Sequence, residues 1–332
     1  MIRVSTEGSR CVVKFGHEKS EEFQTTTGLK QGDALSPILF NIVLEMAVRE
    51  VQEEYQGINC GRNLPVLAYA DDVVILGESE QDIQKATELL IRSAKKRGLN
   101  INETKTKYMR IGRNKGQMRN AAGLQVGGYM FEEVDNFKYL GTNLSSTNDN
   151  HEEIKKRTIS GNKYFYALSG LLGSKLLSKK SKERLYMVLA RPVIMYACET
   201  WPTTQGDENR LAIMERKFLR RIYEPKRYED QTYEIRTNRE LQELFGKPDI
   251  IAEIRHKRLS WLGHVLRAKS IANAVLRWIP QGRRPIGRPK QRWMDKNKKE
   301  LNKLGIDNIT EATMNRDRWK EICFVAMGLN GL

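Results

Sequence analysis

The stretch Leu-Pro-Val-Leu-Ala-Tyr-Ala-Asp-Asp-Val-Val-Ile-Leu, residues 64–76, decides how the first half of the chain folds. Two apolar runs, rich in branched side chains, flank the short step Ala70-Asp71-Asp72, and this pattern predicts a tight β-hairpin. The two adjacent carboxylates repel each other, so they favour a cation or solvent between them. An Asp-Asp pair is also a common turn dipeptide, and taken alone it is better explained as a solvated turn.

Upstream of this hairpin lies the run Gly-Leu-Lys-Gln-Gly-Asp-Ala-Leu-Ser-Pro-Ile-Leu-Phe-Asn, residues 28–41. Ser36 is a good N-cap and Pro37 suits a first helical position, so a helix is predicted over residues 37–55. One apolar face of this helix is expected to be formed by Ile38, Leu39, Ile42, Val43, Met46 and Val51. Downstream of the hairpin, a capping box predicts a second helix over residues 79–97.

The rest of the chain divides into a part with strands and a part with helices. Short strands are predicted at 9–15, 22–26, 108–111, 124–126 and 137–140. Helices are predicted at 151–172, 180–199, 207–223, 238–245, 249–269, 291–304 and 310–326, and Pro192 should kink or break the second of them. The sequence therefore predicts an α+β layer followed by an all-α region. Polar, turn-rich residues near 145–150 and an Arg/Gly/Pro-rich stretch from 280 give the boundaries 1–147, 148–279 and 280–332.

The charge of the chain is concentrated in its second half. Of 57 Lys and Arg and 41 Asp and Glu in all, residues 1–150 carry 19 and 20, which leaves 38 and 21 for residues 151–332. A nearly neutral half joined to a strongly basic half predicts a scaffold or catalytic part beside a part that contacts phosphates. A basic, soluble helical domain remains the alternative.

The cysteines and the apolar segments exclude several classes of protein. Four cysteines, all far apart, argue against a zinc ribbon and against a disulfide framework, and they fit a reducing compartment. The first residues contain no apolar run typical of a secretory signal. The most apolar stretch, 185–198, is interrupted by Arg191 and Pro192, so no membrane span is expected. An intracellular protein of the nucleus, the cytoplasm or both is expected, and its oligomeric state is left open.

Four segments in order resemble the polymerase of retrotransposons. Residues 28–41 together with Tyr69-Ala70-Asp71-Asp72 resemble the palm of reverse transcriptases. Residues 98–107 resemble the segment after the palm helix, and Phe137-Lys138-Tyr139-Leu140-Gly141 resembles the primer grip. Residues 258–265 and 282–289 resemble, more loosely, tail segments of retrotransposon proteins. The chain thus looks like the C-terminal part of a non-LTR (LINE-type) retrotransposon reverse transcriptase, with a partial palm, a basic helical thumb and a tail.

The resemblance implies a role for each of these segments. Asp71 and Asp72 would bind Mg²⁺ (or Mn²⁺), and Lys105 would donate a proton to the leaving pyrophosphate. Tyr69 would lie near the primer terminus, with Gln31 and Gly32 at the nucleotide or template. The primer end would contact Phe137, Lys138, Tyr139, Leu140 and Gly141. The implied partners are an RNA template, a DNA primer, the RNA–DNA duplex and deoxynucleoside triphosphates.

The basic half offers candidate contacts to the nucleic-acid backbone. These are Arg216, Lys217, Arg220 and Arg221 in one helix and Arg283, Arg284 and Arg288 in the Arg/Gly/Pro-rich linker. A solvated helix face is the alternative for the first group, and a plain flexible linker is preferred to minor-groove insertion for the second. Trp278, Trp293 and Trp319 could stack on bases, although anchoring small helices to a core is the commoner task of tryptophan.

One carboxylate that the resemblance requires is missing. Reverse transcriptases carry a further essential aspartate on a strand before the segment at 28–32, and residues 1–32 contain no Asp. The chain alone is therefore expected to polymerise poorly or not at all. Two functions remain open: an RNA-directed DNA polymerase that needs a longer or complementing chain, and a non-catalytic nucleic-acid-binding remnant of such an element.

Overall fold

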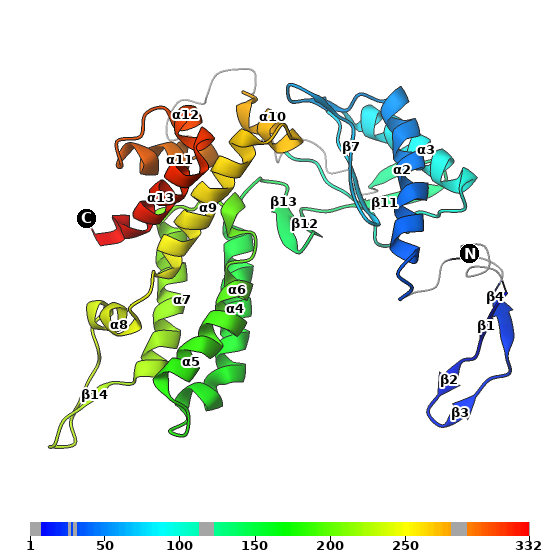
Figure 1. The fold of residues 1–332 in the computed structure, drawn as a ribbon. Helices are drawn as coiled ribbons and strands as arrows, with labels where there is room; N and C mark the ends of the chain where they lie inside the picture. The colour runs from blue at the N-terminus through cyan, green and yellow to red at the C-terminus, as the bar shows by residue number, and fades with distance from the viewer. Residues whose placement is uncertain (1–7, 26–27, 29–31, 113–122, 280–290, 332) are drawn as a thin grey trace. The chain divides into compact units, whose positions relative to one another are not determined.

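The computed structural model describes residues 8–25, 28, 32–112, 123–279 and 291–331. Contacts divide the chain into two compact units (Figure 1). The first comprises the described residues within Met1–Tyr108 and Met118–Glu133, and the second those within Met109–Gln117 and Val134–Leu332. No helix in the described ranges is both long and apolar enough to cross a membrane.

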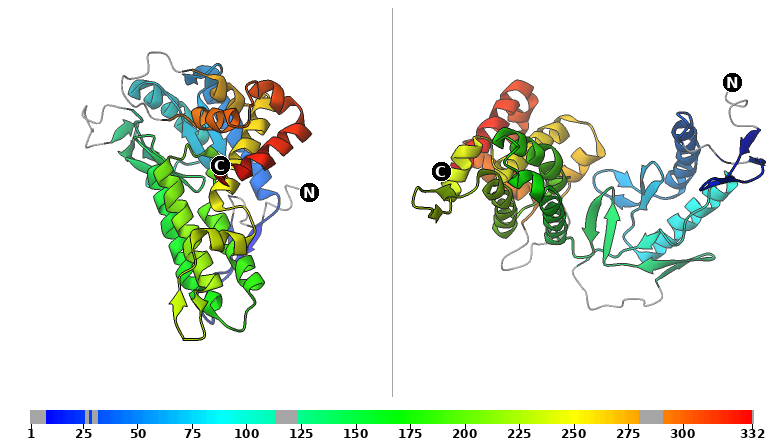
Figure 2. Two further views of the ribbon diagram at one scale, coloured as in Figure 1. Left: turned by 90° about the vertical axis from the view of Figure 1, so that its left-hand side faces the viewer. Right: turned by 90° about the horizontal axis from the view of Figure 1, so that it is seen from below.

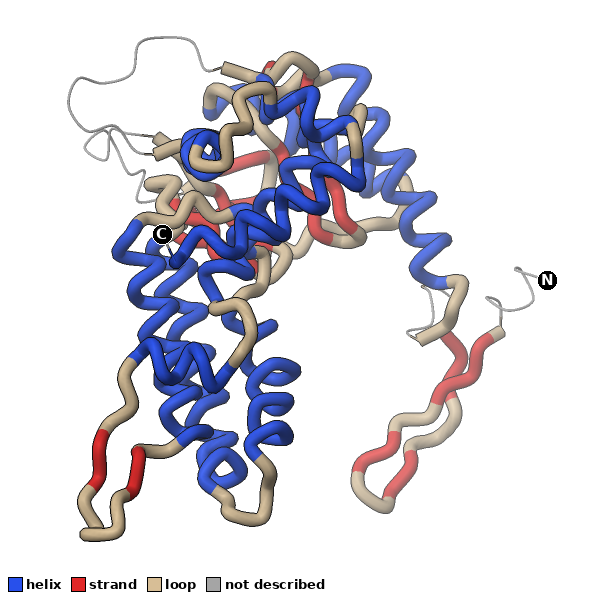
Figure 3. Tube along the Cα trace, turned by 60° about the vertical axis from the view of Figure 1, so that its left-hand side comes forward, coloured by secondary structure: helices blue, strands red, loops and turns tan. Residues whose placement is uncertain are grey.

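The first unit is a mixture of short antiparallel hairpins and two long helices. Its elements are β1 (Ser9–Cys11), β2 (Lys14–Phe15), β3 (Glu18–Lys19), β4 (Phe23–Thr25), α2 (Ser36–Glu54), β5 (Ile58–Asn59), β6 (Asn63–Leu64), β7 (Val66–Tyr69), β8 (Asp72–Ile75), α3 (Glu80–Lys96), β9 (Lys107–Tyr108), β10 (Leu124–Val126) and β11 (Tyr129–Glu133). Strands β1 and β4, β2 and β3, β5 and β6, and β7 and β8 pair antiparallel, and strands are coloured red along the tube in Figure 3. Strand β11 pairs antiparallel with β10 and parallel with β9.

Helices α2 and α3 pack together and form the main core of this unit with the β7–β8 hairpin. The core contains Val48, Val51, Tyr55, Val66, Ala86, Leu89 and Leu90. A polar contact fastens the two helices as well. The Glu50 carboxylate of α2 accepts hydrogen bonds from Ser93 Oγ (2.7 Å), Lys96 Nζ (2.8 Å) and Arg97 Nη1 (2.9 Å), all from the end of α3. Because two cations face one carboxylate, this contact fixes how the two helices pair, in addition to their apolar packing.

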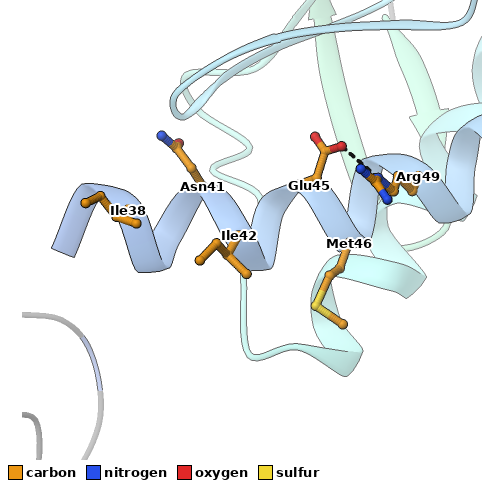
Figure 4. Close-up of a pocket in the computed structure, with 6 residues that line it drawn as sticks. All are labelled: Ile38, Asn41, Ile42, Glu45, Met46 and Arg49. Atoms are coloured by element: carbon orange, nitrogen blue, oxygen red, sulfur yellow. Dashed lines mark hydrogen bonds and ion pairs between the residues drawn. The ribbon is translucent and has the colours of Figure 1, made fainter. Parts of the chain in front are cut away.

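The expected apolar face of α2 is buried only in part. Ile38, Ile42 and Met46 are all more than half exposed, whereas Ala47, Val48 and Val51 are buried. The side of α2 that packs against α3 carries residues 44, 48, 51 and 55. The side that carries residues 38, 42 and 46 therefore remains on the surface. Figure 4 shows these three side chains along the helix beside the ion pair of Glu45 and Arg49. Only part of the predicted apolar face is therefore buried in the core. Ser36 is also the first helical residue and not the N-cap.

The second unit is mainly helical. It contains β12 (Asn136–Tyr139), β13 (Thr142–Ser145), α4 (His151–Gly173), α5 (Lys179–Leu185), the π-helical turn η1 (Tyr186–Ala190), α6 (Arg191–Ile194), the 3₁₀ turn η2 (Cys198–Thr200), α7 (Gln205–Tyr223), β14 (Lys226–Arg227), β15 (Tyr233–Glu234), α8 (Asn238–Phe245), α9 (Ile250–Arg267), α10 (Ile271–Arg277), α11 (Trp293–Asn302), α12 (Ile309–Met314), α13 (Arg316–Val325) and the 3₁₀ turn η3 (Ala326–Gly331). Helix α4 packs against both α6 and α7, and Figure 2 shows the green helices of this unit from two further sides. The first half of α9 joins their core, and its second half joins a second core with α11, α12 and α13.

Two helices depart from the predicted ranges for clear reasons. The predicted helix at 180–199 is interrupted just before Pro192. There the backbone widens into the π-turn η1, in which Arg191 N bonds Tyr186 O, and α6 begins after it. The predicted helix at 310–326 is two helices. Asn315 divides them, since its side chain accepts hydrogen bonds from Asp317 N and Arg318 N and so caps α13.

The fold is mixed, with small sheets in the first unit and many helices in the second. This much of the predicted fold class is confirmed. The β12–β13 hairpin belongs to the helical unit, because the division by contacts falls after Glu133. The domain boundaries at 147 and 279 stay predictions.

Candidate active site and nucleic-acid contacts

The Asp71-Asp72 pair lies at the tip of a two-stranded hairpin. Strand β7 pairs with β8 in a register that places Tyr69 opposite Asp72, so Ala70 and Asp71 form a two-residue turn. Ala70 has a φ of +50°, a left-handed conformation that costs an alanine roughly 1 kcal/mol. Tyr69 and both aspartates are exposed. The hairpin therefore presents two carboxylates and one aromatic ring to solvent from a strained turn.

The base of the hairpin is fixed to the core. Val66 is buried, and Leu76 N bonds Pro65 O at 3.0 Å where the strands end. The Tyr55 hydroxyl donates to Leu76 O at 2.8 Å, which ties the base to the end of α2. Gly77 makes this contact possible, because a Cβ there would lie 2.6 Å from that hydroxyl. A rigid base holds the tip with little reorganisation when it binds a ligand.

Two carboxylates on one tip are suitable ligands for a hard divalent cation. Magnesium is commonly bound by one or two carboxylates, with waters and substrate phosphates completing its shell. Asp71 and Asp72 fit that pattern. Within the described ranges, no group of three or more His, Cys, Asp or Glu side chains could hold a metal ion. The hairpin tip therefore offers two candidate ligands, and a metal site would need further ligands.

The structure describes only some of the other residues expected at the nucleotide. Lys105 is exposed in a turn that Asn102 organises, since Asn102 Oδ1 accepts from Lys105 N at 3.1 Å. No hydrogen bond or ion pair among the described residues joins Lys105 to either aspartate. Gly32 is exposed with a φ of +87°, which only glycine adopts without strain. Gln31 lies outside the described residues.

The residues expected to contact the primer form the β12–β13 hairpin in the second unit. Phe137, Lys138 and Tyr139 lie on β12, and the turn is formed by Leu140 (φ +45°) and Gly141 (φ +79°). Positive φ at both central turn residues matches the twist of a tight hairpin.

Helical residues that the sequence did not single out hold this hairpin. The Tyr196 hydroxyl donates to Leu140 O at 2.8 Å, and Arg157 Nη2 donates to Gly141 O at 2.5 Å. The guanidinium of Arg157 also lies 4.7 Å from the centroid of the Tyr196 ring. These partners are 16 and 56 residues away from the turn in sequence. No local pattern could have found them.

The four candidate cations of α7 lie on two sides of that helix. Lys217 Nζ donates to Asn162 Oδ1 at 2.7 Å, and Arg221 Nη2 contacts Ser169 O at 3.4 Å, so both reach toward α4. Arg220 instead donates to Asn238 of α8. Arg216 follows the spacing of Arg220, one turn before it. The apolar side of α7 is buried and includes Leu211, Met214, Phe218 and Ile222.

The tryptophans serve mainly as anchors. Trp319 is buried and donates to Leu259 O at 3.0 Å, and Trp293 donates to Glu199 O at 2.8 Å. Trp278 is 42% exposed. The linker cations Arg283, Arg284 and Arg288 lie outside the described residues.

Comparisons with known proteins point to one family. Residues 3–144 match the model of the reverse transcriptase (RNA-dependent DNA polymerase) family. A putative uncharacterized transposon-derived protein of Caenorhabditis elegans is 25% identical over 78% of this chain and 94% of its own length.

Two relatives are Pol polyproteins of R2 retrotransposable elements. The one from Popillia japonica is 29% identical over 40% of this chain, and the one from Drosophila melanogaster is 33% identical over 39% of it. The chain spans 23% and 13% of the lengths of these two proteins. The family model and these relatives support the resemblance found in the sequence: residues 3–144 are similar to the reverse transcriptases of non-LTR retrotransposons.

Proposed function

We propose that this chain supplies part of the active site of an RNA-directed DNA polymerase, in which the β7–β8 hairpin carries the metal-binding carboxylates. The observation that supports this most is the exposed Asp71-Asp72 pair on a strained turn with an anchored base. The match of residues 3–144 to the reverse transcriptase family supports it independently. The reaction joins the primer 3′-oxygen to the α-phosphorus of a deoxynucleoside triphosphate and releases pyrophosphate.

Each residue of the proposed site has a distinct task. Asp71 and Asp72 hold Mg²⁺ or Mn²⁺, which when bound offsets the charge of the triphosphate. Tyr69 lies beside the primer terminus, and Gln31 and Gly32 line the nucleotide or template. Lys105 donates a proton to the leaving pyrophosphate.

The second unit provides the contacts to primer and duplex in this proposal. The primer end rests against Phe137, Lys138, Tyr139, Leu140 and Gly141. Cations of α7 contact backbone phosphates of the RNA–DNA duplex as a thumb, with Arg216, Lys217, Arg220 and Arg221 as the candidates, and the first unit acts as a partial palm. Such contacts fix the position of a duplex without reading its sequence. Arg283, Arg284 and Arg288 extend the basic surface.

We further propose that the chain is inactive by itself. Two-metal transfer needs a carboxylate that bridges both ions, and the described residues bring only two carboxylates to the tip. The test is Mg²⁺-dependent extension of a DNA primer on an RNA template by the purified chain and by an N-terminally extended version. Extension is expected only from the extended version, and Asp71→Asn should lower it by about 100-fold or more, as loss of a charge-stabilising group does.

A matched control separates chemistry from a general charge effect. Glu88→Gln removes one negative charge from an exposed position of α3 in the same unit, so extension should continue unchanged. Strong primer extension by the purified chain itself, if it is lost in Asp71→Asn, would refute the proposed inactivity. It would still support the proposal that the hairpin belongs to a polymerase active site. If the N-terminally extended version does not extend a primer either, the proposed polymerase function is refuted.

A second candidate function is nucleic-acid binding without catalysis. Two observations favour it: the partial carboxylate set, and the excess of 38 Lys and Arg over 21 Asp and Glu in residues 151–332. In this case, affinity for an RNA–DNA duplex should fall steeply as salt rises, because phosphate contacts release counterions. Asp71→Asn should leave that affinity unchanged.

A further inference from the structure

The segment Arg-Leu-Ser-Trp-Leu-Gly-His-Val, residues 258–265, lies within α9 and divides into two sets of side chains. The buried set comprises Arg258, Leu259, Leu262, Gly263 and Val265. The exposed set comprises Ser260, Trp261 and His264, and Lys257 precedes it on the same side of the helix. Positions 257, 260, 261 and 264 have the spacing of a single stripe along a helix.

Packing explains the buried set. Arg258 Nη2 lies 2.5 Å from Glu300 Oε2, and its Nε bonds Asn297 Oδ1 at 3.1 Å, so it fastens α9 to α11. Gly263 leaves room for Trp319, because a Cβ there would lie 2.2 Å from the indole nitrogen. Nothing comparable accounts for Trp261 and His264.

Trp261 and His264 form an open aromatic stack. Their ring centroids are 5.2 Å apart with an angle of 21° between the planes. Trp261 remains 38% exposed, although an indole normally gains from burial. Within the part of the chain that the structure describes, no hydrogen bond holds either ring. Two flat rings are therefore arranged parallel on the surface, with ring area still available to a third.

The charges beside this stack favour a nucleic acid. Lys257 is exposed on the same stripe, and no carboxylate among the described residues forms an ion pair with it. The stripe itself carries no acidic residue. An aromatic platform with an adjacent unpaired cation offers a base a stacking surface and its phosphate a counter-charge. A purely apolar protein partner would leave Lys257 without such a role.

We propose that Trp261 and His264 bind a nucleobase of single-stranded DNA or RNA by stacking, with Lys257 contacting the adjacent phosphate. The site requires an unpaired base, because bases within a duplex already stack on their neighbours. It is formed by residues of α9 alone and needs no metal ion. It is therefore independent of the proposed polymerase activity.

The test measures binding of the full chain to fluorescein-labelled oligothymidylate and to a duplex of the same length, without nucleotides or metal. Trp261→Ala should weaken binding of the single strand about tenfold, within the usual range for base–aromatic stacking. Trp261→Phe should restore most of the affinity. Binding of the duplex should change less than about twofold, because duplex contacts are made by phosphates. Ser260→Ala, on the same stripe, is the matched control and should behave as the wild type.

Photo-crosslinking then locates the base. An oligonucleotide containing 5-iodouracil should crosslink to Trp261 or His264, as read by mass spectrometry of the digested chain. Unchanged single-strand affinity in Trp261→Ala would overturn the proposal and indicate a protein contact at this stripe. Equal losses for single strand and duplex would overturn it too, since they would indicate altered folding or phosphate binding. Crosslinks confined to other parts of the chain would have the same consequence.

Discussion

Substitution of Glu300 by alanine tests how the helical unit is held together. The Glu300 carboxylate lies 2.5 Å from Arg258 Nη2 and 3.4 Å from Arg255 Nε. The Arg258 side chain is 1% exposed and that of Glu300 is 9% exposed. Without the carboxylate, two guanidinium groups stay buried, and arginine cannot relieve this by losing its proton. Removing one partner of a buried ion pair costs about 3–5 kcal/mol, a large part of the roughly 5–15 kcal/mol that stabilises a domain.

Chemical denaturation of the full chain measures this cost. With tryptophan fluorescence and circular dichroism as readouts, Glu300→Ala should shift the unfolding midpoint of the helical unit strongly to lower denaturant. The control is Glu243→Ala, which removes the exposed partner of Arg239 and should produce no clear shift. A loss below about 1 kcal/mol in Glu300→Ala would refute the reasoning, because it would mean that water or another anion readily compensates the guanidinium charges.

Three more substitutions or treatments have defined outcomes. Hydrogen bonds, chiefly from Lys96, lower the pKa of Glu50 to about 2. Its contribution to stability is therefore complete above about pH 4.5 and is lost as the pH falls toward 2, so the difference in melting temperature between wild type and Glu50→Gln should disappear over that range. Gly263→Ala should cost about 1–3 kcal/mol, because the new methyl group overlaps the indole beneath it; an unchanged melting temperature would contradict this. Burial raises the pKa of the Cys198 thiol to about 12, so iodoacetamide at pH 8 should alkylate the half-buried Cys11 well before Cys198 in the native chain, and equal rates would show that the core opens readily.

Local patterns predicted those elements whose signals lie within a few residues. The β7–β8 hairpin was predicted because two apolar runs flank a short step, although β8 begins at Asp72, one residue before the second apolar run. Helix α3 was found from its cap, since Ser79 accepts a hydrogen bond from Asp82 N. The sequence also placed a break at Pro192. It did not indicate that the break takes the form of a π-turn.

Features that depend on distant partners were not predictable. No local pattern indicates that Ile42 is exposed, because which side of α2 is buried depends on where α3 packs. The anchoring of the β12–β13 turn depends on Arg157 and Tyr196, which no motif connects with it. Likewise, the sequence of residues 258–265 indicates only a resemblance to retrotransposon tail segments. The separation into a buried Arg258 and an exposed Trp261 required the structure.

The two hairpins use the same kind of anchor at different places, and this has a consequence for function. A tyrosine hydroxyl donates to a backbone carbonyl in each: Tyr55 to Leu76 at the base of β7–β8, and Tyr196 to Leu140 at the turn of β12–β13. The first arrangement fixes the strands and leaves the Asp71 tip free to approach a ligand. The second uses the carbonyl of the turn itself.

Because the Leu140 and Gly141 carbonyls already accept hydrogen bonds from the protein, the turn of β12–β13 is positioned by the helices. On the strand itself, Lys138 is exposed, and Phe137 and Tyr139 are partly exposed. Within the proposed primer contact, Lys138 is therefore the residue suited to meet a phosphate, whereas Leu140 and Gly141 set the angle at which the strand is presented. A hydrogen bond from a tyrosine hydroxyl to a backbone carbonyl is thus present in both hairpins. In one it leaves the tip with the two carboxylates unattached, and in the other it fixes the turn and so the face of the strand.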